Sequence, residues 1–367
     1  MKNACLVITN QTLFPCDSYA PVLSAFARNG YSFQETRVLP LANDELVRAA
    51  FIDLKNAYEN VSVIACGVAI GAIRALMEDV FQKSFPQETP SGVGVHTQGA
   101  KTLFLLSADS KETGEIYAEA VCVPHLNAKY AIRQAAMAIR CVGVDGQALE
   151  TVLAQARRMG NGLLSIVATT AYGETVIRIF YGAATPKLLL DDVVRFVMEQ
   201  LNENVYAMDD TPLEVQLIQL LKLRGKKISV AESFTGGGIA QRIVSVSGAS
   251  SVYFEGLNTY AEASKMARLG VSEYTLRTHG AVSKETAYEM AAGLLSTGNC
   301  QVAISTTGLA GPQSDGSGLP IGLCCIGVGV EDKVYVYSYR LDGDRETITK
   351  TAINYALFLA CKQLKNL

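Results

Sequence analysis

A serine followed closely by three glycines is the part of this chain best suited to chemistry. Residues 231–238 read Ala-Glu-Ser-Phe-Thr-Gly-Gly-Gly, and Ser233 is the third of them. A β-type run over 227–230 precedes the segment, and an apolar-periodic helix is expected over 239–246. A hydroxyl in this position faces unpaired backbone N–H groups and the positive end of a helix dipole. The local pattern suits a nucleophile beside an oxyanion hole, a phosphate cradle or a simple helix cap, and it leaves all three open.

A serine nucleophile needs a base, and residues 258–265 contain the best candidate. A strand is expected to give way to a helix there, with Tyr260 and Lys265 near the junction. Burial can lower the pKa of a lysine until it accepts a proton, and a tyrosine can relay or orient that proton. An exposed lysine and a tyrosine packed at the sheet edge explain the same pattern. His279 precedes Gly280 and is interpreted as a turn residue rather than as the base.

The composition is that of an ordinary globular protein. Of the 367 residues, 49% are hydrophobic and 18% are charged, and the formal net charge is −3. This balance predicts no binding to nucleic acid or to an anionic membrane. The nine cysteines form no CxxC pair and no Cys/His cluster, which predicts free thiols and no structural metal site. The apolar runs are too short for a signal peptide or a membrane span, so a cytoplasmic location is expected.

The elements that must position the serine fall into three expected domains. Over residues 1–130 the strand and helix signals alternate, which is typical of a doubly wound α/β sheet, and a loop rich in proline and glycine is expected over 84–100. Residues 131–205 read as strand, helix, hairpin and helix, a small α+β domain. Residues 206–367 read as an α/β domain that opens with a helix capped by Thr211.

Six short motifs in the last domain resemble, in their order, the C-terminal domain of the CinA family, the nicotinamide mononucleotide amidohydrolases. The motifs are 231–237, 247–251, 260–265, 280–283, 307–312 and 343–346. The resemblance implies hydrolysis of the carboxamide of nicotinamide mononucleotide to nicotinate mononucleotide and ammonia, with no metal or other cofactor. It also implies nicotinamide mononucleotide or a related pyridine nucleotide as the partner, and a homodimer.

The family's site residues fall on matching positions of this sequence. The resemblance implies Ser233 as the nucleophile, with Lys265 and Tyr260 taking its proton. The implied oxyanion and substrate donors are Thr235, Gly236, Gly237, Thr307, Gly308 and Gly311. The loop over 308–318 suits a nucleotide phosphate or ribose, and it equally suits a plain surface loop.

The chain also departs from the family pattern around this site. Phe234 replaces the usual cysteine, Ala261 and Glu262 replace a Ser-Asn pair, and Leu319 replaces a lysine in the second glycine loop. These departures keep a second hypothesis open. It is a catalytically impaired relative that binds pyridine nucleotides or serves as an oligomeric scaffold.

Residues 1–130 resemble, more faintly, the molybdopterin-binding-like domain of full-length CinA proteins. That domain is associated with a metal-dependent ADP-ribose pyrophosphatase, which needs carboxylates around a hard cation. Residues 65–71 replace the family's Gly-Gly-Leu-Gly-Pro-Thr loop, and Asp17, Glu78 and Asp79 are interpreted as solvated surface charges. The sequence therefore predicts that this domain has lost the pyrophosphatase activity and serves assembly or regulation.

Overall fold

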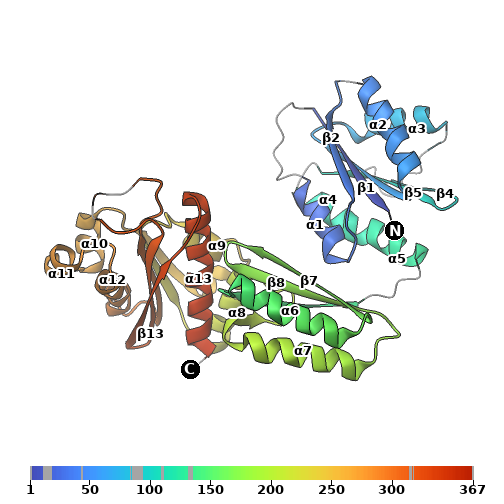
Figure 1. Cartoon of the computed structure of the whole chain (residues 1–367). Coiled ribbons are helices and arrows are strands. Elements are labelled where there is room, and N and C mark those ends of the chain that lie inside the picture. The colour runs from blue at the N-terminus through green and yellow to red at the C-terminus, as the bar shows by residue number, and fades with distance from the viewer. Residues whose placement is uncertain are drawn as a thin grey trace. The chain divides into compact units, whose positions relative to one another are not determined.

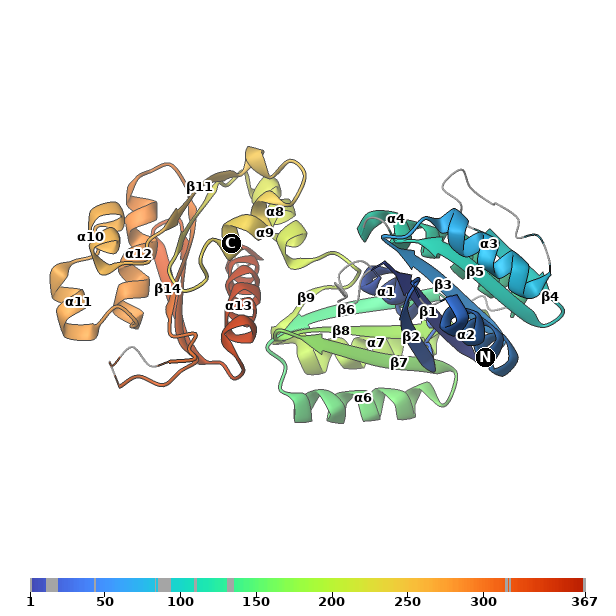
Figure 2. The same cartoon turned by 90° about the horizontal axis from the view of Figure 1, so that it is seen from above.

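The computed structural model describes residues 2–10, 19–42, 44–82, 84, 94–108, 111–130, 135–313, 316 and 318–365. They cluster into two compact units, Met1–Ala136 and Met137–Leu367, and each unit is shown in Figures 1 and 2. The described residues form an α/β fold with two five-stranded sheets and one four-stranded sheet. The second unit contains both the segment expected as a small α+β domain and the segment that carries Ser233.

The first unit is a doubly wound α/β domain, as the alternating signals predict. Its sheet has the order β2-β1-β3-β5-β4. The parallel strands are β1 (Asn3–Thr9), β2 (Glu35–Pro40), β3 (Asn60–Cys66) and β5 (Lys101–Ser107). The antiparallel edge strand β4 (Gly94–Gln98) lies inside the expected loop over 84–100, so that expectation is wrong there. Val95 is the only apolar residue of β4, so the sequence shows no alternation of apolar and polar residues that would predict a strand. Residues 85–93 of the expected loop lie outside the described residues.

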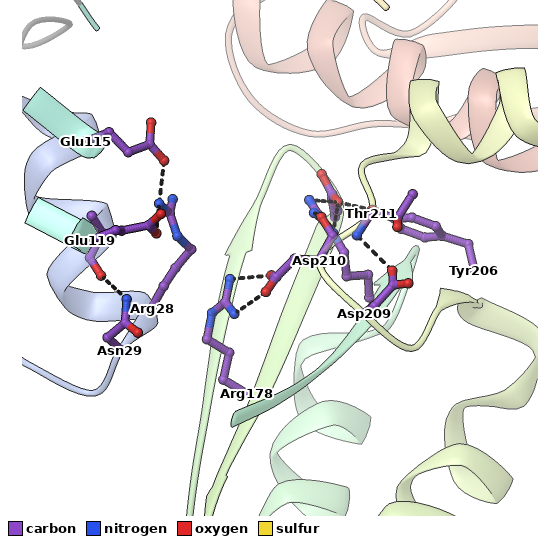
Figure 3. Close-up of polar contacts among 12 residues, drawn as sticks. Arg28, Asn29, Glu115, Glu119, Arg178, Tyr206, Asp209, Asp210 and Thr211 are labelled. Carbon is purple, nitrogen blue, oxygen red and sulfur yellow. Dashed lines mark hydrogen bonds and ion pairs between the residues drawn. The ribbon is translucent and has the colours of Figure 1, made fainter. Parts of the chain in front are cut away.

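Helices cover both faces of this sheet. The helices α2 (Asp44–Ala57) and α3 (Ile70–Phe81) pack on one face. The other face carries α1 (Ala20–Arg28), α4 (Lys111–Tyr117), the π-helical turn Ala118–Cys122 and α5 (Val123–Lys129). Arg28 of α1 joins these helices through ion pairs with Glu115 and Glu119 (Figure 3).

The acids weighed for metal chemistry in this unit do not come together. Asp79 pairs with Arg48 at the surface, and Asp17 lies outside the described residues. Across the described ranges, no three His, Cys, Asp or Glu side chains are grouped so as to hold a metal ion. Within the same ranges, no helix is long and apolar enough to cross a membrane. The eight cysteines of the described residues are free and buried.

The second unit opens with a sheet of order β7-β8-β6-β9. Its strands are β6 (Ala135–Val142), β7 (Leu164–Ala171), β8 (Glu174–Tyr181) and β9 (Val205–Ala207). The helices α6 (Gly146–Gly160) and α7 (Lys187–Leu201) pack on one of its faces. The expected hairpin is confirmed, and its turn residues Tyr172 and Gly173 both have positive φ, 51° and 73°.

The hairpin turn contacts the last helix of the chain, α13 (Arg345–Lys365). The Asn354 side chain donates to the Tyr172 carbonyl at 3.0 Å, and Lys350 Nζ lies 4.7 Å from the centre of the Tyr172 ring. A Cβ on Gly173 would lie 2.8 Å from the Tyr355 ring, so the approach requires glycine at this position. The two sheets of the second unit are therefore joined through α13.

The connection from β9 to the next helix is also tied to the first of these sheets. Arg178 of β8 donates two hydrogen bonds to the Asp210 carboxylate at 2.7 and 3.1 Å, and Asp209 accepts the Thr211 N–H at 2.8 Å (Figure 3). The helix α8 (Leu213–Arg224) begins two residues later without a side-chain cap. The expectation that Thr211 caps this helix is therefore wrong. The Thr211 N–H donates to Asp209 in a turn that ends before the helix starts.

The C-terminal sheet has the order β11-β10-β12-β13-β14. The strands β10 (Ile228–Glu232), β11 (Tyr253–Asn258) and β12 (Val302–Gly308) are parallel, and β13 (Leu323–Val330) and β14 (Lys333–Arg340) form an antiparallel hairpin. Figures 1 and 2 both show α9 (Gly238–Val244) and α13 on one side of this sheet, with α10 (Glu262–Leu269), α11 (Glu273–His279) and α12 (Lys284–Ser296) on the other.

The alternation of side chains along β10 explains the two layers. Ile228 and Val230 enter the core with α8, α9 and α13, while Ala231 enters the core with α10 and α12. The chain leaves β10 toward one face and leaves the neighbouring β11 toward the other. A crevice forms at the carboxyl ends of parallel strands where such a switch occurs, and ligands of α/β proteins bind in that place.

Candidate active site

Ser233 lies directly after β10, at the carboxyl edge of the sheet, and is buried. Its N–H donates to the Thr306 carbonyl of β12 at 3.1 Å. Two residues later, the hydroxyl oxygens of Thr235 and Thr306 lie 2.7 Å apart. The turn that carries the serine is therefore fixed to the neighbouring strand by its main chain and by a side chain.

Lys265 reaches the serine from α10 on the opposite face. Its Nζ lies 3.0 Å from Ser233 Oγ, 2.7 Å from the Thr259 carbonyl and 3.2 Å from the Tyr260 carbonyl. The side chain is only 1% exposed, so the interpretation of an exposed surface lysine is wrong. Burial lowers the pKa of Lys265, and the negative charge of Glu262 acts in the opposite direction.

The contacts of Lys265 suit a neutral amine that accepts a proton. A neutral amine has two N–H donors and one lone pair. Nζ lies within donor distance of the two carbonyls and of Ser233 Oγ, so the ammonium form would satisfy all three acceptors. In the neutral form, the carbonyls of Thr259 and Tyr260 accept the two donors and the lone pair faces the Ser233 hydroxyl. Among the described residues, no carboxylate accepts a hydrogen bond from Lys265, so the charge of Glu262 favours the protonated amine without direct contact.

Tyr260 contributes to this arrangement through its main chain. Its carbonyl accepts from Lys265, whereas its side chain is 66% exposed. Within the described ranges, the phenol has no hydrogen bond to Ser233 or Lys265. The chain enters α10 with the Tyr260 carbonyl toward the lysine, and the proton relay through the tyrosine side chain stays a prediction.

The N-terminus of α9 is closed by the protein's own Glu232. The carboxylate of Glu232 accepts the N–H groups of Gly237 at 3.1 Å, Ile239 at 3.0 Å and Ala240 at 2.9 Å. The Gly236 N–H is also used, because it donates to the Ser233 carbonyl at 3.1 Å. The expectation that Gly236 and Gly237 supply oxyanion donors is therefore wrong, and so is the phosphate cradle.

Two donors remain beside the serine. Among the described residues, the N–H groups of Phe234 and Thr235 have no hydrogen-bond partner. The N–H of the residue after a nucleophile is a common oxyanion donor. Of the expected donors, Thr235 thus keeps a place in the site, and Phe234 joins it through its main chain.

The residues expected on the glycine loop serve mainly to hold it in place. The Thr307 hydroxyl donates to the Ala281 carbonyl at 2.5 Å. A Cβ on Gly308 would lie 2.9 Å from the Phe234 ring, and the Gly311 carbonyl accepts from Arg345 at 2.7 Å. These contacts position the loop next to the serine turn.

His279 lies outside the site, whereas Phe234 packs beneath the serine turn and borders the groove beside it. His279 ends α11, and its ring lies 3.8 Å from Glu285, in agreement with the interpretation that it is not the base. The Phe234 ring is 6% exposed and belongs to a small apolar cluster with Leu341, Ile348 and other residues. The replacement of the family's cysteine by Phe234 therefore affects the packing beneath the serine turn.

A groove of about 670 Å³ adjoins the serine turn. Gly236 and Gly237 form one wall, and the beginning of α13 forms the other. The second wall carries Arg345, Glu346 and Lys350, and Lys350 forms an ion pair with Glu346. Among the described residues, Arg345 is the cation of this wall that has no carboxylate partner. An anionic group of a ligand would be attracted to this position.

The sequence prediction missed two contributors. Glu232 could have been predicted as a cap, because acidic side chains are favourable near helix N-termini. The Thr259 carbonyl had no sequence signal, since any residue at that position supplies the same group.

Comparison with known proteins agrees with the six motifs. A profile described as CinA C-terminal domain matches residues 210–364. A competence-damage inducible protein from Alkaliphilus metalliredigens is 32% identical over 292 residues, which cover 76% of this chain and 68% of the relative. Another, from Caldicellulosiruptor saccharolyticus, is 42% identical over 183 residues, or 50% of this chain and 44% of the relative. This match thus spans less than half the length of the relative.

A solved structure is also similar to part of this chain. The CinA superfamily protein from Klebsiella pneumoniae 700603 is 28% identical, with a TM-score of 0.41, and the match covers 42% of this chain and 97% of that chain. The Alkaliphilus match extends over three quarters of the sequence and includes most of the relative. The chain therefore belongs to the CinA family.

Proposed function

We propose that this chain hydrolyses the carboxamide of nicotinamide mononucleotide to nicotinate mononucleotide and ammonia. The observation that carries the proposal is the 3.0 Å contact between Lys265 Nζ and Ser233 Oγ, with both groups buried. Family membership suggests the substrate class, because the six motifs resemble nicotinamide mononucleotide amidohydrolases. Arg345 in the adjoining groove, which has no carboxylate partner among the described residues, suits an anionic nucleotide.

In the first half of the reaction, neutral Lys265 takes the proton of the Ser233 hydroxyl while Oγ attacks the amide carbon. The carbonyl oxygen becomes an oxyanion, and the N–H groups of Phe234 and Thr235 are the donors available to stabilise it. One such donor contributes about 10²–10³-fold in rate in other hydrolases. The C–N bond then breaks, and the Lys265 ammonium returns its proton to the departing nitrogen, which leaves as ammonia.

The second half releases the acid. Water attacks the acyl carbon of the Ser233 ester, and Lys265 accepts a proton from that water. The second tetrahedral intermediate collapses, the Oγ–acyl bond breaks, and the proton returns to Ser233. Nicotinate mononucleotide is released as the carboxylic acid, which loses its proton to solvent and becomes the carboxylate. The carbonyls of Thr259 and Tyr260 keep Lys265 oriented in both steps by accepting its other N–H groups.

The proposal is tested by measuring ammonia release from nicotinamide mononucleotide. The variants are Ser233→Ala and Lys265→Met, with Ser251→Ala as control, because Ser251 is exposed and its hydroxyl donates to the Gly248 carbonyl. We expect turnover by the wild type and the control, and a loss of at least about 10³-fold in the other two.

Two results would contradict this mechanism. Equal release by wild type and Ser233→Ala would remove the nucleophile. A folded wild type that binds the nucleotide without releasing ammonia would favour the alternative of a catalytically impaired binding protein.

A further inference from the structure

The carboxylate of Glu232 takes no part in the proton transfers described above, although it is next to the nucleophile in sequence. It ends β10 and is 1% exposed. In the described part of the chain, no lysine or arginine pairs with it. Three backbone N–H groups hold it instead, at 2.9–3.1 Å. Burying a charge is costly unless its hydrogen bonds are made, so both oxygens are tightly committed to α9.

The main chain of Glu232 contacts the segment that holds Lys265. The Glu232 carbonyl accepts the Thr259 N–H at 2.7 Å. The Thr259 carbonyl accepts from Lys265 Nζ, which contacts the Ser233 hydroxyl. A closed ring of contacts thus passes through Glu232, Thr259, Lys265 and Ser233.

The five residues 233–237, between Glu232 and α9, contain the groups proposed to act in the reaction. They contain the proposed nucleophile Ser233 and the N–H groups of Phe234 and Thr235, which have no partner among the described residues, and they end in Gly236 and Gly237. Both glycines have positive φ, 62° and 95°, so local preferences alone hold this turn weakly. The carboxylate spans the turn and ties its far end to the end of β10.

We propose that Glu232 is the positioning residue of this site. Its carboxylate fixes the turn over 233–237, so that Ser233 Oγ stays within reach of Lys265 and the two free donors keep their places. The proposal rests on the proposed function and adds a residue to it. A displacement of about 1 Å in a catalytic group can cost about 10²-fold in rate, which sets the size of the expected effect.

An ordinary helix cap provides the comparison. Asp145 accepts the Gln147 and Ala148 N–H groups at 3.0 Å each and caps α6. It is exposed, immediately precedes its helix and encloses no candidate catalytic residue. Asp145→Asn keeps one acceptor oxygen and removes the charge of an exposed cap, as Glu232→Gln does for the buried carboxylate, so it reports the stability cost of neutralising a helix cap.

The test compares Glu232→Gln and Glu232→Ala with Asp145→Asn. The first readout is the rate at which a fluorophosphonate probe labels Ser233, and the second is kcat and KM for ammonia release. The glutamine variant keeps one acceptor oxygen but turns an NH₂ toward backbone donors, so we expect both rates to fall about tenfold. We expect a fall of about 10²-fold in Glu232→Ala. KM and the pH midpoint should stay near the wild-type values, and Asp145→Asn should lose stability at unchanged rates.

Specific outcomes would overturn the proposal. Labelling of Glu232→Gln within twofold of the wild-type rate would show that the carboxylate is only a cap. A shifted pH midpoint with an unchanged plateau rate would show that Glu232 acts through the charge of Lys265 instead of through position. If Glu232→Ala does not fold, the glutamine variant decides.

The two readouts separate this proposal from the proposed function. A wild type that is labelled at Ser233 but releases no ammonia contradicts the substrate, and the labelling rates still decide the role of Glu232. A wild type with neither labelling nor turnover contradicts both proposals, since no activated serine would exist to be positioned.

Discussion

The Ser233 hydroxyl and the Lys265 amine lie 3.0 Å apart, although 32 residues separate them in the chain. They come from opposite faces of the C-terminal sheet and meet at the carboxyl ends of two neighbouring parallel strands. The contact is enclosed by protein and has no carboxylate among its described partners. Proton transfer within the pair would therefore depend strongly on the low pKa of the lysine.

The pH dependence of activity should follow Lys265. Because burial lowers the pKa of this lysine, the neutral base forms below the pH at which an ordinary lysine loses its proton. We expect kcat/KM to rise with pH and to level off before pH 10.5. Lys265→Arg should be inactive at every pH because arginine stays protonated, while the exposed Lys222→Met should keep the wild-type profile. A profile that is flat from pH 5 to pH 10 would contradict a lysine base.

The stability of the protein should reveal the same group. The pKa of Lys265 is lower in the folded state than in the unfolded state, so the unfolded chain binds more protons between those two values. The free energy of unfolding of the wild type should therefore rise with pH through that window relative to Lys265→Met. At pH values below the pKa of Lys265 in the folded state, the difference in unfolding free energy between wild type and Lys265→Met should not change with pH. Urea unfolding of both proteins from pH 7 to pH 10.5 measures it, and a difference that falls with pH would have the wrong sign.

Tyr260→Phe separates the main-chain role of this residue from a role of its phenol. The carbonyl that holds Lys265 is kept, and the lost hydroxyl belongs to a side chain that is 66% exposed. We expect the fluorophosphonate labelling rate of Ser233 to stay within threefold, and any change in turnover to fall on KM. Tyr274→Phe, on the exposed surface of α11, is the matched control. A tenfold loss of labelling in Tyr260→Phe alone would support the phenol as a proton relay.

Phe234 should matter for stability more than for chemistry. Its ring is almost completely buried under the serine turn, so Phe234→Ala should cost about 3–5 kcal/mol of unfolding free energy. The backbone N–H is unchanged, and the labelling rate of Ser233 should fall less than tenfold. Phe254→Ala on β11, where the ring is 45% exposed, should cost less than about 1 kcal/mol. Equal costs for the two variants would contradict the packing described for Phe234.

The sequence predicted the elements around the site better than their contacts. The strand, glycine turn and helix at 228–244 follow from buried β-type residues and glycine chemistry. The burial of Lys265 was also encoded, because it lies four residues before the buried Leu269 on the same face of α10. Apolar periodicity counts lysine as a surface residue and hides this signal.

Other features had no local signal at all. Whether Tyr260 presents its phenol or its carbonyl to the lysine depends on how β11 ends, which is a property of the whole sheet. The same holds for Glu232, whose carboxylate closes a helix that begins after the turn. In each case a residue of the expected type is present, and only the tertiary structure decides which of its atoms acts.

The buried cysteines allow the unfolding of each sheet to be followed separately by thiol alkylation. Alkylating reagents need an accessible thiolate, and burial raises the pKa of Cys141, Cys324 and Cys361 to about 12. Cys5 lies in the first sheet, Cys141 in the second and Cys324 in the third, while Cys361 lies on α13. Mass spectrometry of iodoacetamide-treated protein would therefore time the opening of each sheet, with no label introduced into the chain.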